Sequence, residues 1–127
     1  MATDQEILAQ IKSEIRAHGL WKRRLKKAID QGKPDMEVKD IESDNLCQFG
    51  KWLASLSGES SSQYWDVKLK HALFHRKAAE VVKLAVDGEK LKAMKAIDSG
   101  GSYLQVSSEL KEAMMNWEKE LKAKRAA

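Results

Sequence analysis

The sequence contains little of what disulfide-bonded, membrane-spanning or β-rich proteins need. It has one cysteine and one proline among 127 residues. A single cysteine excludes an internal disulfide framework, which fits a reducing compartment. No apolar run approaches the roughly 18 residues of a membrane span. The polar residues after Met1 are also unlike the apolar core of a signal peptide, so we expect a cytoplasmic protein without membrane insertion.

The residues that are abundant favour helix. Alanine, leucine, lysine and glutamate are frequent, and no strand-like alternation of apolar and polar residues is found. The length predicts one domain over residues 1–127. The net charge is +4, and the densest basic run is "WKRRLKK" (Trp21–Lys27). Acidic and basic residues are interspersed elsewhere, so we expect a solvated helix face at this run and no nucleic-acid partner.

The first expected helix has clear signals at both ends. Thr3 and Glu6 form a capping box at its start. Apolar positions then recur every three or four residues as far as Ile29, and His18 occupies one position of this apolar stripe. Gly32 and Pro34 stop the helix in the expected order. We therefore predict one continuous helix from Thr3 to Gly32.

Similar signals divide the rest of the chain into four more helices. The second follows the possible N-caps of Glu42–Asn45, and serines before Tyr64 can cap the third. The expected helices run from Leu46 to Gly58, from Tyr64 to Asp87, around Leu91–Ile97 and from Tyr103 to Leu121. The predicted fold is all-α: a four-helix-type bundle with one additional short helix.

Two of the three histidines stand one turn apart in the expected third helix. His71 and His75 occupy positions i and i+4, where Cβ atoms lie about 5–6 Å apart on one helix face. This separation allows both imidazoles to reach one metal ion. A pair of this kind alone more often has a structural role, so further ligands are needed to argue for a metal.

The remaining histidine and the cysteine fall where a bundle would turn them toward this pair. His18 lies on the apolar stripe, and Cys47 falls in the first turn of the second helix, where free N–H groups favour a thiolate. Three imidazoles and one thiolate would complete a tetrahedral zinc shell in the bundle core. Copper remains an alternative, as does a site without metal in which the histidines are core residues and Cys47 is a small buried hydrophobe.

Three segments of the chain resemble a known family. They are "HGLWK" (His18–Lys22), "LCQFGKWL" (Leu46–Leu53) and "HALFH" (His71–His75). In order and separation they are similar to the signatures of the CZB, or chemoreceptor zinc-binding, domain. The later "SGGSYLQVSSEL" (Ser99–Leu110) and Trp117 resemble the end of the same domain. The resemblance covers roughly residues 5 to 120.

The resemblance implies Zn²⁺ as the cofactor and His18, Cys47, His71 and His75 as its ligands. Family members are cytoplasmic bacterial sensor domains, often homodimers, that regulate chemoreceptor signalling domains or diguanylate cyclases. Zinc occupancy and oxidation of the zinc-bound cysteine are the two signals considered for them. The resemblance therefore implies a sensory domain with a chemotaxis or cyclic-di-GMP output in cis or in trans, and no catalytic residues.

Other classes of function make different demands on the sequence. A zinc hydrolase needs an open coordination position and a general base, whereas four protein ligands leave no opening. A hemerythrin-like di-iron protein would need about five histidines and bridging carboxylates, and this chain has three histidines. A metal-free helical interaction module remains the main alternative, and its zinc content would distinguish it.

Overall fold

The computed structural model describes residues 3–35, 37–43, 47–56 and 61–126. These residues form helices and contain no strand, which confirms the predicted all-α class. No helix in this part of the chain is long and apolar enough to cross a membrane. The helices are α1 (Asp4–His18), α2 (Trp21–Gln31), α3 (Val38–Glu42), α4 (Gln48–Ser55), α5 (Ser62–Val86), α6 (Lys90–Ile97) and α7 (Ser102–Ala126).

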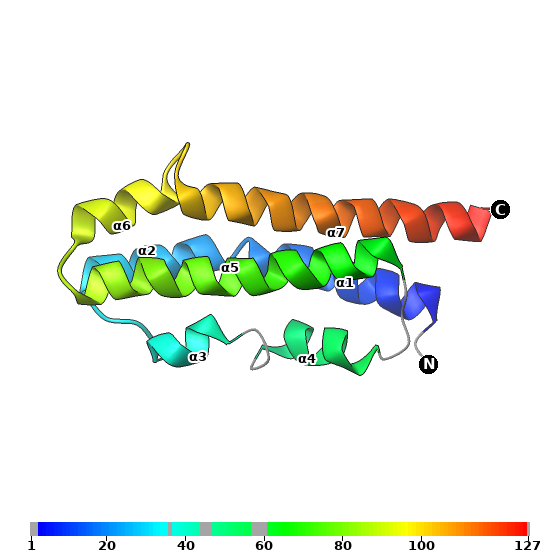
Figure 1. Ribbon diagram of the computed structural model, residues 1–127, viewed down its shortest axis with the longest axis horizontal. Helices are drawn as coiled ribbons and strands as arrows, with labels where there is room; N and C mark the ends of the chain where they lie inside the picture. Colours follow the sequence, from blue (N-terminus) through cyan, green and yellow to red (C-terminus); the bar gives the residue numbers. More distant parts are fainter. Residues whose placement is uncertain (1–2, 36, 44–46, 57–60, 127) are drawn as a thin grey trace.

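The helices lie in four rows along one long axis (Figure 1). Helix α5 runs through the middle, and α1 and α2 follow one another behind it. Helices α6 and α7 lie along one side of α5, and α3 and α4 lie along the other. Helix α5 packs most extensively against α7 and also contacts α2, α3, α4 and α6. This arrangement confirms the predicted four-helix-type bundle, with α6 as the additional short helix.

Several helices begin and end at the residues that the sequence predicts. The side chain of Thr3 accepts a hydrogen bond from the Glu6 N–H at 3.1 Å and caps α1. Gly32 caps the C-terminus of α2 with a left-handed φ of 70°, a conformation that glycine adopts without steric cost. Ser61 caps α5 by accepting from the Gln63 N–H. Polar caps and glycine stops therefore account for these ends.

The prediction of one continuous first helix is wrong. Helix α1 ends at His18 and α2 begins at Trp21. Gly19 and Leu20 keep right-handed helical dihedral angles, so the interruption is local. The N–H of Leu20 bonds to the carbonyl of Ala17, three residues back, in the tighter pattern of a 3₁₀ turn. Glycine's low helix propensity explains the position of the break.

The connection between α2 and α5 differs from the prediction in its first part. Helix α3 is only five residues long and was not predicted, although it buries Ile41. Of the predicted caps Glu42–Asn45, Glu42 ends α3 and Ser43 is its C-cap, so neither caps the next helix. The other two caps and the predicted start, residues 44–46, and the predicted end, Gly58, lie outside the described residues. Within them, α4 starts at Gln48 with Cys47 as its N-cap.

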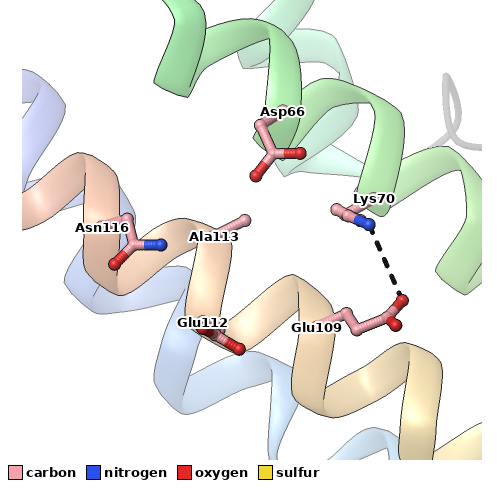
Figure 2. Close-up of a pocket in the computed structure, with 6 residues that line it drawn as sticks. All are labelled: Asp66, Lys70, Glu109, Glu112, Ala113 and Asn116. Atoms are coloured by element: carbon pink, nitrogen blue, oxygen red, sulfur yellow. Dashed lines mark ion pairs between the residues drawn. The ribbon is translucent and has the colours of Figure 1, made fainter.

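A groove between α5 and α7 is lined by polar side chains (Figure 2). Lys70 on α5 faces Glu109 on α7, and their charged groups lie 3.7 Å apart. The other lining residues are Asp66, Glu112, Ala113 and Asn116. In the part of the chain that the structure describes, one group of side chains is suited to hold an ion, and it lies in the core rather than in this groove.

Candidate metal centre

Cys47 lies at the N-terminal end of α4, and its sulfur caps that helix. The sulfur accepts a hydrogen bond from the backbone N–H of Gly50 at 3.2 Å. This N–H group and the positive end of the helix dipole favour the anionic thiolate, which is the form that binds metals. Cys47 is half-buried, so its sulfur faces the core while the residue stays close to the surface.

His71 and His75 on α5 meet this sulfur in the core. The Nε2 atom of His71 lies 3.3 Å from Sγ of Cys47 and 3.1 Å from Nε2 of His75. Both histidines are at most 3% exposed. His75 donates its Nδ1–H to the backbone carbonyl of Ile41 on α3 at 2.9 Å, which leaves a lone pair on Nε2.

The three side chains fit a zinc ion in chemistry and spacing. One donor atom from each of Cys47, His71 and His75 lies within 4.8 Å of the other two. Zn–N bonds of about 2.0–2.1 Å and Zn–S bonds of about 2.3 Å give tetrahedral edges of about 3.3–3.6 Å. The observed separations of 3.1 and 3.3 Å are close to these edges. Thiolate and imidazole donors also favour zinc over magnesium or calcium.

Burial keeps the imidazoles of His71 and His18 in the neutral form that a metal requires. Mainly burial, and to a smaller extent the nearby His75 and His18, lower the pKa of His71 to about 3. Burial also lowers the pKa of His18 to about 4, against a hydrogen bond to Ser107 that raises it. At neutral pH both rings are therefore uncharged, and neither has to lose a positive charge before a metal binds.

His18, the fourth predicted ligand, lies beside this group but is not part of it. It is the last residue of α1 and is 4% exposed, which confirms its place on the buried stripe. Its ring packs on Phe74, with 4.4 Å between ring centroids. Its Nε2 atom lies 2.7 Å from the hydroxyl of Ser107 on α7. A role of His18 as a ligand thus remains a prediction.

Aromatic rings surround the candidate ligands. Phe49 lies edge-on to His71 at a centroid distance of 5.2 Å, and Trp21 lies edge-on to His75 at 5.7 Å. Trp52 does not contact the histidines in this way but stacks on Phe49 at 5.6 Å. Such an apolar wall limits the access of water, which controls both the local dielectric and exchange of an ion.

The sequence interpretation did not include Ile41 and Ser107, although both contact predicted ligands. Ile41 contributes a backbone carbonyl, which leaves no signal in the residue type. Ser107 stands one turn after Tyr103, which is buried, and one turn before Leu110, which is also buried. This position on the inner side of a helix is the only sequence signal that could have pointed to the serine.

A model of the chemoreceptor zinc-binding domain, CZB, matches residues 18–82 of the chain. The chain belongs to this family. The match begins at His18 and includes Cys47, His71 and His75, whereas α6 and α7 lie beyond it. Comparison with curated proteins and with solved structures found no match.

Membership in the CZB family settles the type of cofactor. Zn²⁺ is the ion that this domain binds, and a buried Cys/His cluster suited to it is present in the core. The domain is sensory and not catalytic. The predicted family and cofactor are therefore confirmed, while the four-residue ligand set and the signalling output remain predictions.

Proposed function

We propose that residues 1–127 form a single zinc-dependent sensor domain in which His18 completes a shell begun by Cys47, His71 and His75. The observation that carries this proposal is the meeting of two buried imidazoles and one half-buried thiol, from two helices, within 4.8 Å of one another. Buried polar side chains normally satisfy each other's hydrogen bonds, yet Nδ1 of His18 has no partner among the described residues. This unpaired ring nitrogen supports a metal role of His18 over an ordinary polar core.

Each residue of the proposed site has a separate task. Cys47 supplies the anionic donor and is held by the Gly50 N–H. His75 is oriented by the Ile41 carbonyl, which fixes Nε2 as the nitrogen with a lone pair. When bound, the ion supplies a cross-link between the helices that carry its ligands. In the absence of that link, α1, α4 and α5 are held together by side-chain packing and by hydrogen bonds such as that from the Tyr64 hydroxyl to the Leu53 carbonyl.

We infer two routes by which this link can carry a signal. A change in zinc availability alters the fraction of chains that hold the closed arrangement. Oxidation of the Cys47 sulfur to a sulfenic acid removes the anionic donor, and the three imidazoles are redox-inert by comparison. We propose a cytoplasmic bacterial homodimer whose output is a chemoreceptor signalling domain or a diguanylate cyclase, as family membership supports.

Zinc content per chain tests this proposal directly. Protein stripped with a chelator and then reconstituted should hold one zinc per chain, and Cys47→Ala, His71→Ala and His75→Ala should each lose most of it. Gln48→Ala is the matched control, because Gln48 is exposed and adjoins Cys47 without contributing a donor to the group. Treatment with hypochlorous acid should release zinc from the wild type if the cysteine is the sensor.

The outcomes separate the alternatives. Zinc that survives the oxidant would leave zinc occupancy as the signal. A wild-type chain that takes up no zinc after reconstitution would refute the site and leave a metal-free helical interaction module. Retention of zinc by Cys47→Ala at wild-type affinity would show that the sulfur is not a ligand.

A further inference from the structure

A hydrogen bond joins His18 on α1 to α7 next to the candidate zinc site. Nε2 of His18 and the Ser107 hydroxyl lie 2.7 Å apart, and the two residues are 89 positions apart in the sequence. Tyr103, one turn earlier on α7, is also buried. Helix α7 lies beyond the segment that matches the CZB family, so the match assigns Ser107 no role.

The surroundings of the His18 ring determine which nitrogen carries the proton. Nε2 faces the Ser107 oxygen, whereas Nδ1 is buried without a hydrogen-bond partner among the described residues. If Nε2–H donates to Ser107, Nδ1 carries a lone pair. The other tautomer would bury an N–H group without an acceptor, and orphaned buried N–H groups are rarer in proteins than orphaned acceptors. The hydrogen bond therefore selects Nδ1 as the nitrogen with the lone pair.

On the basis of the proposed zinc site, we propose that Ser107 is the positioning residue of His18. The Ser107 oxygen accepts a hydrogen bond from Nε2–H of His18, which leaves the lone pair of Nδ1 to bind zinc. His75 has the opposite arrangement, because its Nδ1–H donates to the Ile41 carbonyl and its Nε2 carries the lone pair that can bind zinc. In both cases an oxygen from another helix fixes the nitrogen that does not bind the ion, as the outer partners of metal-bound histidines usually do. The site thereby includes a contact to α7, which supplies no predicted ligand.

The identity of the bound ring nitrogens tests the assignment. The full chain, labelled with ¹⁵N-histidine and loaded with ¹¹³Cd in place of zinc, should show metal–nitrogen coupling at Nδ1 of His18 and Nε2 of His75. Coupling at Nε2 of His18 would overturn the inference, as would coupling at His75 with none at His18. Absence of coupling at every histidine would refute the zinc site itself, together with this inference.

Substitution of the serine gives a second and independent readout. Ser107→Ala should weaken zinc binding about 10- to 100-fold in a chelator competition, the usual effect of losing such an outer partner. Ser107→Thr keeps the hydroxyl and should restore most of the affinity. Ser108→Ala, at the exposed neighbouring position, is the matched control and should bind like the wild type.

The unfolding midpoint of the metal-free protein separates positioning from a merely structural role. Alanine is a good helix former, so Ser107→Ala should unfold within a few degrees of the wild type while binding zinc more weakly. Equal zinc affinity of Ser107→Ala and wild type would overturn the inference while leaving the zinc site intact. A loss of affinity that Ser107→Thr does not restore would also count against a role for the hydroxyl.

Discussion

Substitution of Cys47 by serine separates the two tasks of this residue. The sulfur caps α4 by accepting the Gly50 N–H at 3.2 Å, and it lies 3.3 Å from Nε2 of His71. Serine is among the best N-cap residues, so Cys47→Ser keeps the cap and removes the thiolate. Cys47→Ala removes both. The two variants should therefore agree in zinc binding and differ in the stability of the metal-free protein.

The expected magnitudes follow from the two contacts. Replacing a serine N-cap by alanine costs about 1 kcal/mol, so metal-free Cys47→Ser should be about 1 kcal/mol more stable than Cys47→Ala. For a chain of this size that is a difference of about 3–6 °C in Tm. Zinc at about 1,000 times its Kd adds about 4 kcal/mol to wild-type stability, and a 100-fold loss of affinity would leave about 1.4 kcal/mol.

Thermal unfolding of the three proteins with chelator and with excess zinc measures both effects. The zinc-induced rise in Tm should be large for the wild type and small for both variants. With chelator, Cys47→Ser should unfold at or above the wild-type temperature, and Cys47→Ala below it. A metal-free Cys47→Ser protein as unstable as Cys47→Ala would refute the capping argument. An undiminished zinc response in both variants would refute the assignment of the sulfur as a ligand.

Three further predictions concern stability. Burial raises the pKa of Glu14 from 4.5 to about 7, so the folded state binds the proton more tightly and the wild type loses stability as pH rises through that window. Glu14→Gln should therefore gain about 1–2 kcal/mol at pH 8 and almost nothing at pH 4.5, and an advantage independent of pH would contradict this. A Cβ on Gly101 would lie 2.3 Å from two backbone carbonyl oxygens of α6, so Gly101→Ala should cost about 1–3 kcal/mol in denaturant unfolding. Gly19→Ala, whose Cβ would come no closer than 3.5 Å to its nearest neighbour, is the control and should cost less. Tyr64→Phe removes a buried 2.8 Å hydrogen bond to the Leu53 carbonyl and should cost about 1–2 kcal/mol, so an unchanged denaturation midpoint would show that this carbonyl finds another partner.

The sequence predicted the elements whose signals are local. Thr3 and Ser61 mark helix starts because their hydroxyls can cap a helix, and Gly32 marks a helix end because it has no Cβ. The structure has caps at all three residues. The break at Gly19 was missed because the apolar stripe continues across it with unchanged spacing. Helix α3 was missed because five residues are too few to show a helical period.

The candidate site was predictable to the extent that it depends on helical spacing. His71 and His75 meet because they are one turn apart, and Cys47 at the start of α4 reaches them through the packing of α4 against α5. The partners that orient the rings lie far away in the sequence: Ile41 is 34 residues from His75, and Ser107 is 89 residues from His18. Such contacts depend on how the helices pack, which no local pattern specifies.

The contacts of α7 with α5 and with His18 differ in how they respond to a movement of His18. Helix α7 packs against α5 with buried apolar side chains such as Leu110 and Met114, and apolar packing is non-directional. The Lys70–Glu109 ion pair at this interface is partly exposed. The 2.7 Å hydrogen bond to Ser107 is directional and weakens steeply when its geometry changes. Since His18 is not yet within the group formed by Cys47, His71 and His75, completing a four-residue shell requires its ring to approach them. The proposed role of Ser107 keeps this hydrogen bond in the zinc-bound state, so we expect α7 to follow the ring of His18.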